Sequence, residues 1–311
     1  MTADQIVPNL RQYRTEPSLP SYPSGACVAC GGTVPWAAPM DFADNNSHRC
    51  PSCGAKAGRL RLVREALARR WPGTWGYFSS DVHLSDRLEI EVGGFATYKL
   101  ISKPMKWTST VCFVDAGDVP WSASASLNVF DEYMFANMRD AMAGNDGAIS
   151  AGTRFPVIWH QFGLSSLGAV PAWRQALFGA YQLIETNPSA AVVLIASGFE
   201  SYFLDIMRIA WQESGLQVSA FDRMTDRNPP ITSLVTWLPA AVGRSTLNEA
   251  PGDLHTRWSN AVNKRRNDVV HRANVHFTST EAQDSLSVAL ETICYFDEAA
   301  LARPHAYYTS R

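Results

Sequence analysis

The sequence has no long apolar run and little excess charge of either sign. None of its apolar stretches approaches the roughly 18 residues that a membrane-spanning helix needs. The stretch MTADQIVPNLRQYRTEP at its start has no apolar core of the signal-peptide kind. A net charge of -2 excludes a uniformly basic nucleic-acid coat protein, but it allows a local basic surface. We therefore expect a cytoplasmic protein that has no contact with a membrane.

Cysteine is also scarce, and four of the six cysteines fall into two Cys-x-x-Cys pairs. In a reducing compartment such pairs indicate metal ligands rather than disulfides. The 19 residues between the pairs suit one tetrahedral Zn²⁺ site, and four thiolates would close its coordination shell, which predicts a structural role. The predicted ligands are Cys27, Cys30, Cys50 and Cys53. His48 could substitute for one of them, whereas Cys112 and Cys294 lie in apolar patterns typical of a core.

The organisation of the chain predicts a multidomain α+β protein. Its composition, 46% hydrophobic and 18% charged, is ordinary for a folded chain of several compact units. Changes in pattern along the chain divide it into an extended arm, a zinc ribbon with a basic helix, a small β-rich middle domain, and a C-terminal all-α helical bundle. The expected bounds of these segments are 1–24, 25–73, 74–165 and 166–311.

The middle segment shows strand patterns. Residues 88–92 alternate strictly between apolar and charged side chains, and residues 110–114 form an apolar run typical of a buried strand. Residues 155–159 include a proline, which favours a last edge strand. We expect one helix in this segment, near residues 130–142.

From Pro171 onward the sequence predicts five helices joined by short loops. The second helix begins with the N-cap Asn187 and ends at Gly215, and apolar residues recur along it at intervals of three and four. The first covers residues 171–185, the third 231–238 and the fourth about 253–272. Thr280-Glu281-Ala282-Gln283 fits a capping box that would start the fifth.

A basic run follows the cysteine pairs, with Glu65 as the one opposing charge. It could grip a phosphate backbone, or it could be the solvated face of an ordinary helix. The candidate nucleic-acid contacts in this run are Arg59, Arg61 and Arg64.

The segment with the clearest chemistry is Arg266-Asn267-Asp268-Val269-Val270-His271. An imidazole can transfer a proton near neutral pH, and a guanidinium can hold the oxygens of a phosphate. On a helix Asn267 and His271 would be neighbours, whereas Arg266 and His271 would be about 140° apart around the axis. One helix therefore does not direct both groups at one phosphate unless the long guanidinium wraps across the helix, or two copies of the chain combine their groups.

The spacing between arginine and histidine does not by itself distinguish this segment, because Arg154 and His160 show the same kind of spacing. The residues between those two are bulky and apolar and include Pro156, which favours a strand or a loop. Arg266–His271 instead stands beside further basic residues that are candidate nucleic-acid contacts, namely Lys264, Arg265 and Arg272.

At Arg266–His271 the chain resembles the HEPN superfamily, whose signature is an arginine, a polar residue, three or four more residues and a histidine. The helical layout of residues 171–303 and the segment Phe199-Glu200-Ser201-Tyr202-Phe203 are similar to that family as well. The resemblance implies a metal-independent endoribonuclease that acts as a homodimer on RNA. His271 would act as general acid or base, Arg266 would hold the phosphate, and Asn267 would position His271 or the substrate. Asp268 and Glu200 would be auxiliary.

The same resemblance implies a toxin or antiviral, abortive-infection effector, in which a trigger or an antitoxin protein controls the activity. Two other interpretations remain open. In one, the ribbon and a non-catalytic HEPN-like bundle form an adaptor or dimerisation module that binds nucleic acid or a protein partner. In the other, the ribbon is the nucleic-acid reader of a regulator and the bundle is its dimeriser.

Overall fold

The computed structural model describes the chain in several stretches, which are residues 10–12, 24–27, 29–35, 48–57, 59–68, 74–80, 82–91, 95–99, 106–114, 121–123, 126–130, 133–137, 141–143, 147–148, 154–164, 170–227, 229–272 and 276–296. The chain forms two compact units. One comprises residues 1–21 and 82–166, and the other comprises residues 22–81 and 167–311. The cysteine pairs therefore belong to the same unit as the C-terminal helices.

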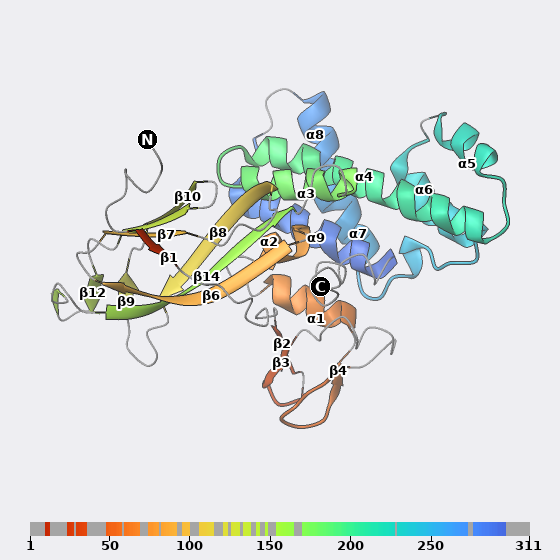
Figure 1. Cartoon of the computed structure of the whole chain (residues 1–311). Coiled ribbons are helices and arrows are strands. Elements are labelled where there is room, and N and C mark those ends of the chain that lie inside the picture. Colours follow the sequence, from red (N-terminus) through yellow and green to blue (C-terminus); the bar gives the residue numbers. More distant parts are fainter. Residues whose placement is uncertain are drawn as a thin grey trace. The chain divides into compact units, whose positions relative to one another are not determined.

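The described residues of the first unit are strands that form three sheets (Figure 1). The sheets have the orders β1-β7-β11-β10, β13-β12-β9 and β6-β14-β8. Strand β1 from the N-terminal arm runs parallel to β7, and all other pairings in this unit are antiparallel. The strands are β1 (Leu10–Gln12), β6 (Val82–Glu91), β7 (Phe95–Lys99), β8 (Lys106–Val114), β9 (Trp121–Ala123), β10 (Ser126–Phe130), β11 (Tyr133–Asn137), β12 (Ala141–Ala143), β13 (Gly147–Ala148) and β14 (Arg154–Leu164).

The helix predicted near residues 130–142 is wrong, because β11 and β12 occupy that segment. Strand β11 pairs with β10 on one side and with β7 on the other. Its residues Tyr133-Met134-Phe135-Ala136-Asn137 suit a helix by their spacing, but the ladder bonds to two neighbours and the aromatic side chains favour a strand. Pairing between distant segments overrides local preference here.

The expected edge strand at 155–159 is part of β14, which lies at the centre of its sheet between β6 and β8. Pro156 pairs with Glu89 of β6, and the pairing with β8 begins one residue later, at Val157. A proline has no N–H to donate to a ladder, and Pro156 lies at an end of β14 where β6 is paired and β8 is not. The discarded pair Arg154 and His160 thus lies in a strand.

The second unit begins with two small hairpins that carry the cysteine pairs. Strands β2 (Ser24–Ala26) and β3 (Thr33–Pro35) form the first, and β4 (His48–Arg49) and β5 (Lys56–Ala57) form the second. Helix α1 (Arg59–Ala68) follows and contacts both β2 and helix α9 (Ser279–Phe296). Helix α2 (Thr74–Ser79) contacts α3 (Ala172–Leu183) and α9 (Figure 1). Buried apolar residues of α1, including Leu62, Val63 and Leu67, form the face that makes these contacts.

The longest helix among the described residues is α4 (Pro188–Glu213), which contacts several other helices of this unit. Helix α3 (Ala172–Leu183) packs along α4. The predicted start of α4 is confirmed, since the Asn187 side chain accepts a hydrogen bond from the N–H of Ala190 at 3.2 Å and Pro188 is the first helical residue. The predicted end is also confirmed: Gly215 has a φ of 75°, which a residue with a Cβ rarely adopts.

Within the described residues, α4 is one helix that is long and apolar enough to span a membrane, contrary to the expectation from the sequence. Half of the apolar stretch of α4 is buried inside the structure, and the core helix of a soluble protein can be as long and as apolar as a helix that spans a membrane. Its buried residues include Phe199, Tyr202 and Phe203, and α4 contacts α3 and α9. This packing accounts for its apolar sequence.

Shorter elements follow α4. Helix α6 (Ile231–Ala241) covers the predicted third helix and extends past it through Pro239. The sequence did not predict α5 (Val218–Thr225) or the 3₁₀ turn η3 (Leu247–Glu249). In α5 one residue, Phe221, is buried, so its apolar pattern is too sparse to reveal a helix.

The predicted fourth helix is one helical run with three parts: α7 (Leu254–Trp258), the π-helical turn η4 (Ser259–Lys264) and α8 (Arg265–His271). The fifth is α9 (Ser279–Phe296). Its capping box begins at Thr278 rather than at Thr280: the N–H of Glu281 donates to Oγ1 of Thr278, and Oε2 of Glu281 accepts from the N–H of Thr278 at 2.9 Å. Thr278 is the N-cap because it stands three residues before Glu281, whose carboxylate can bond back to the N-cap backbone.

Candidate functional site

The four predicted metal ligands come together. The sulfur atoms of Cys27, Cys30, Cys50 and Cys53 all lie within 4.8 Å of one another. Sγ of Cys27 is 3.5 Å from Sγ of Cys53, and Sγ of Cys30 is 3.7 Å from Sγ of Cys50. These distances are too long for a disulfide bond and close to the edge, about 3.8 Å, of a tetrahedron of thiolates around one metal ion.

Each hairpin turns its two thiols inward in the same way. The N–H of Gly31 donates to the carbonyl of Cys27, and the N–H of Gly54 donates to the carbonyl of Cys50, both at 2.8 Å. The glycines have φ values of 71° and 73°, so the tight turn needs a residue without a Cβ. The backbone N–H of Cys53 lowers the pKa of the Cys50 thiol to about 6, and the N–H groups of Cys30 and Ala29 lower the pKa of Cys27. The turns therefore favour the thiolate forms of Cys27 and Cys50, whereas the sulfur atoms of Cys30 and Cys27 raise the pKa of the Cys53 thiol to about 12.

Helix α1, which follows the hairpins, is tied to the helical core by a buried acid. Arg64 Nε donates to Oε1 of Glu291 at 2.7 Å, and Arg257 Nη1 lies 2.8 Å from Oε2 of the same carboxylate. The Glu291 side chain is 1% exposed, so one carboxylate of α9 is paired with arginines from α1 and α7. We call Arg64, Glu291 and Arg257 the buried ionic triad.

The triad bears on the predicted basic patch. Arg64 is held by the fold, whereas Arg61 is 54% exposed and pairs with Glu65 on its own helix at 3.1 Å. The side chain of Arg59 lies outside the described residues. The role of these arginines in binding nucleic acid stays a prediction, and Arg64 is the one that the structure ties to another task.

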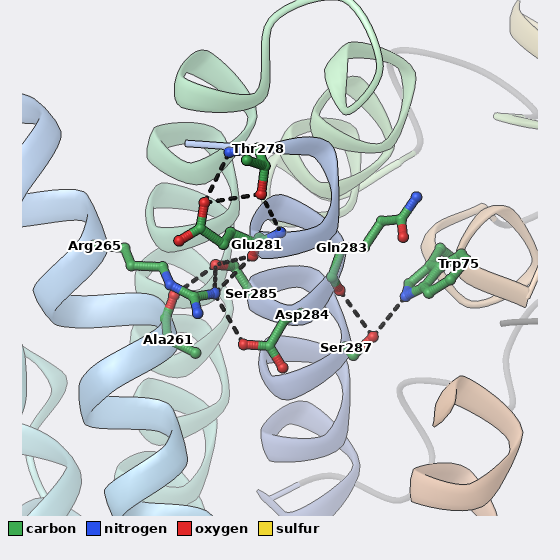
Figure 2. Close-up of polar contacts among 9 residues, drawn as sticks. All are labelled: Trp75, Ala261, Arg265, Thr278, Glu281, Gln283, Asp284, Ser285 and Ser287. Carbon is green, nitrogen blue, oxygen red and sulfur yellow. Dashed lines mark hydrogen bonds and ion pairs between the residues drawn. The ribbon is translucent and has the colours of Figure 1, made fainter. Parts of the chain in front are cut away.

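The Arg–His segment lies on α8, directly after the π-helical turn. π-Helical turns are rare and frequently occur at functional sites. Arg265, the first residue of α8, fastens this region to α9 (Figure 2). Its Nη1 donates to the carbonyl of Glu281, to Asp284 Oδ2 and to Ser285 Oγ at 2.7, 2.9 and 3.0 Å.

Ser285 completes this attachment. Its hydroxyl lies 2.6 Å from the carbonyl oxygen of Ala261 in the π-helical turn, and it is fully buried. On the same helix, the Ser287 hydroxyl accepts a hydrogen bond from the Trp75 indole at 2.6 Å (Figure 2). Helix α9 thus supports α8 through Arg265 and Ser285, and α2 through Ser287.

Arg266 and Asn267 line a cavity of about 430 Å³, together with Glu200 of α4 and Asn263 of the π-helical turn. Arg266 Nη1 donates to Oδ1 of Asn267 at 2.9 Å, so the amide orients the guanidinium. Burial raises the pKa of Glu200, and the positive charge of Arg266 opposes this shift. Three predicted site residues are therefore close together in one polar cavity.

The other predicted residues of α8 lie elsewhere on the helix. His271 is its last residue and is exposed, and it does not line the cavity of Arg266. Asp268 Oδ1 is 3.4 Å from Nε of Arg272, a pair on the helix surface, and Lys264 is exposed. In one chain Arg266 and His271 therefore face different surroundings, as their spacing on an α-helix requires.

Sequence reasoning missed Asn263 and Thr232, which also line the cavity. The position of Asn263, four residues before Asn267, is a signal that could have identified it, because residues four apart share a helix face. No such signal exists for Thr232, which α6 brings to the cavity from a distant part of the sequence.

Comparison of the chain with protein-family models, with curated proteins and with solved structures found no match. The resemblance to the HEPN superfamily therefore rests on the residues quoted for it.

Proposed function

We propose that this protein is a metal-independent endoribonuclease of the HEPN type. The observation that carries the proposal is the placement of α8: Arg266 and Asn267 line a polar cavity with Glu200, and His271 ends the same helix on the exposed surface. A cation fixed in a cavity suits a phosphate, and an exposed imidazole can reach a hydroxyl.

The reaction is an attack by a ribose 2′-hydroxyl on the adjacent phosphate. The bond from phosphorus to the 5′-oxygen breaks as the 2′-oxygen attacks. His271 removes the proton of the 2′-hydroxyl or protonates the leaving 5′-oxygen, and solvent water exchanges the other proton. Arg266 binds the phosphate and offsets the charge that grows on its oxygens in the transition state, and Asn267 keeps the guanidinium in place. The products carry a 2′,3′-cyclic phosphate and a 5′-hydroxyl, and DNA, which has no 2′-hydroxyl, is not cut.

The active form is a homodimer with composite sites. Because Arg266 and His271 are separated by about 140° on α8, the two groups meet at one phosphate when two copies of α8 face each other. Val270, the neighbour of His271, is 51% exposed, so an apolar side chain is available for such a contact. Lys264 and Arg272, both exposed, would bind flanking phosphates of the RNA.

The cysteine site holds one structural Zn²⁺ ion in this proposal. Four cysteine sulfurs at these distances suit zinc and leave no open position for a substrate. Zinc would stabilise the two hairpins, and Arg59 and Arg61 beside them would contact RNA. We further propose that the protein is a toxin or antiviral effector in the cytoplasm and that a trigger or an antitoxin controls its activity.

The test is a cleavage assay with full-length wild type, Arg266→Ala, His271→Ala and the control His276→Ala, whose exposed histidine lies beyond α8. Each protein is incubated with cellular RNA, transfer RNA and single-stranded DNA in EDTA, and circular dichroism checks the fold under the same conditions. Wild type and the control should cut RNA alone and leave cyclic phosphates. The two site variants should be slower by about 100-fold or more.

Equal cleavage by wild type and His271→Ala would overturn this assignment. Absence of cleavage by folded wild type, including with cell extract added as a source of triggers, would favour the non-catalytic adaptor instead. In that case Arg266 and Asn267 would serve binding rather than chemistry.

A further inference from the structure

The cavity that Arg266 lines extends well beyond the space that one phosphate needs. Its volume of about 430 Å³ lies in the range of small-molecule sites. Helix α4, the start of α6, the π-helical turn and α8 all contribute to it. The proposed cleavage reaction uses Arg266 and Asn267 of this lining and leaves the rest without a role.

The remaining lining has two chemically distinct parts. Leu204, Pro229, Pro230 and Ile231 are apolar and offer flat or branched surfaces. Glu200, Asn263 and Thr232 offer hydrogen-bonding groups. Apolar surfaces beside hydrogen-bonding groups suit a flat heterocycle, since the apolar surfaces contact its faces and the polar groups contact its edge.

Glu200 and Arg266 carry opposite charges within this lining and interact electrostatically. A phosphate is attracted to Arg266 and repelled by the carboxylate of Glu200, so the ring attached to that phosphate lies toward Glu200. Glu200 is partly buried, and its pKa is raised by that burial and lowered by Arg266. A carboxylate in such surroundings benefits from hydrogen-bond donors that satisfy both oxygens.

We propose that this cavity binds a guanine base of the RNA beside the cleaved phosphate, with Glu200 as the residue that determines specificity. An ionised carboxylate accepts hydrogen bonds and donates none. Guanine has two adjacent donors, N1–H and the 2-amino group, on its Watson–Crick edge, which match the two carboxylate oxygens. Adenine, cytosine and uracil each place an acceptor next to their donor on that edge, and the acceptor would face the carboxylate unpaired.

This inference rests on the proposed function, because it takes the ligand to be RNA. It adds which base the site reads and which residue reads it. Asn263 and Thr232 lie in the same lining, where they can bond to the remaining polar atoms of the base.

The test measures binding, so that it does not depend on cleavage. Full-length His271→Ala is titrated calorimetrically with the 3′- and 5′-monophosphates of guanosine, adenosine, cytidine and uridine. The double variant His271→Ala/Glu200→Gln is then titrated with the same nucleotides. In at least one of the two series, guanosine monophosphate should bind about tenfold or more tightly than the other three. Glu200→Gln should remove that preference and leave the weak binding of the others unchanged.

Asp205→Asn is the matched control. Asp205 lies on the same helix, is exposed and does not line the cavity. This variant should keep the guanine preference. If Glu200→Gln does not fold, Asn263→Ala serves as the second variant, and it should weaken the binding of guanosine monophosphate.

Equal binding of all four nucleotides, a preference for another base, or no nucleotide binding would overturn the inference. These results differ from a failure of the proposed function. RNA cleavage without base preference would refute the guanine site and leave the proposed nuclease activity standing. Selective binding of guanosine monophosphate by a protein that never cuts RNA would refute the nuclease activity and leave the guanine site standing.

Discussion

Arg64 and Glu291 form an ion pair across 227 residues of sequence, with 2.7 Å between Nε and Oε1. Arg64 lies on the helix that follows the cysteine hairpins, and Glu291 lies in the C-terminal half of α9. Helix α9 also binds Arg265, the residue before Arg266, through Asp284 and Ser285. One helix thus supports both the helix that follows the cysteine hairpins and the segment with the proposed catalytic residues.

The buried ionic triad should contribute measurably to stability. Arg64→Met keeps much of the side-chain volume and removes the charge, so Glu291 is left with Arg257 as its partner. Since Arg64 is 38% exposed and the carboxylate keeps one cation, we expect a loss of about 1–3 kcal/mol in the free energy of unfolding. Denaturant titration of the full chain measures it.

The control for that experiment is Arg61→Met on the same helix. Arg61 pairs with Glu65 at the surface, and such a pair contributes at most about 0.5 kcal/mol. An equal loss in the two variants would show that the triad adds nothing beyond a surface pair. The double variant Arg64→Met/Glu291→Met should lose less than the sum of the single ones, because the two residues interact.

Metal content should depend on the four clustered cysteines. Mass spectrometry of the native protein should find one zinc ion per chain, and Cys50→Ser should abolish it because three ligands leave the tetrahedron incomplete. Cys294→Ala is the matched control, since Cys294 is buried in α9 outside the cluster. Zinc in Cys50→Ser at the wild-type level would refute the assignment.

The start of α9 gives a test of the corrected capping box. Thr278→Ala removes the hydroxyl that accepts from the N–H of Glu281, and such a loss costs about 1 kcal/mol, or roughly 2–4 °C in melting temperature for a unit of this size. Thr280→Ala, two residues later and exposed, should have a much smaller effect. The reverse order would support the box that the sequence suggested.

The same box should make stability depend on pH. Hydrogen bonds from the N–H and hydroxyl of Thr278 lower the pKa of Glu281. A lowered folded-state pKa stabilises the protein above the unfolded value, near 4.3, and the stabilisation is lost as the pH falls through the folded-state pKa. The stability difference between wild type and Glu281→Gln should therefore shrink on acidification below about pH 4. A difference that stays constant from pH 7 to about pH 3 would contradict this mechanism.

Mixed dimers test the composite site. Arg266→Ala and His271→Ala are each expected to be inactive, but a mixed dimer contains one site with both groups intact. After subunit exchange, an equimolar mixture should recover about a quarter of wild-type activity if association is random. A mixture of either variant with the double variant should recover none. No recovery in the first mixture, despite proven exchange, would place both groups in one chain.

Several elements could be predicted from the sequence because their causes are local. The Cys-x-x-Cys spacing and the glycines after it suffice to turn two thiols inward, and Asn187-Pro188 suffices to begin α4. Apolar residues at intervals of three and four predicted the long helices, because burial of one face repeats with the helix period.

Only the tertiary structure decided the rest. Strand β11 replaces a predicted helix since two distant strands pair with it, and Pro156 is tolerated because one neighbour begins after it. The sequence indicated that Arg64 is a surface cation, whereas the fold pairs it with Glu291 of α9. The cavity joins Glu200, Thr232 and Arg266 from three helices. Sequence by itself determines which residues can do chemistry and which segments are periodic, whereas the distances that bring those residues together depend on packing between segments far apart in the chain.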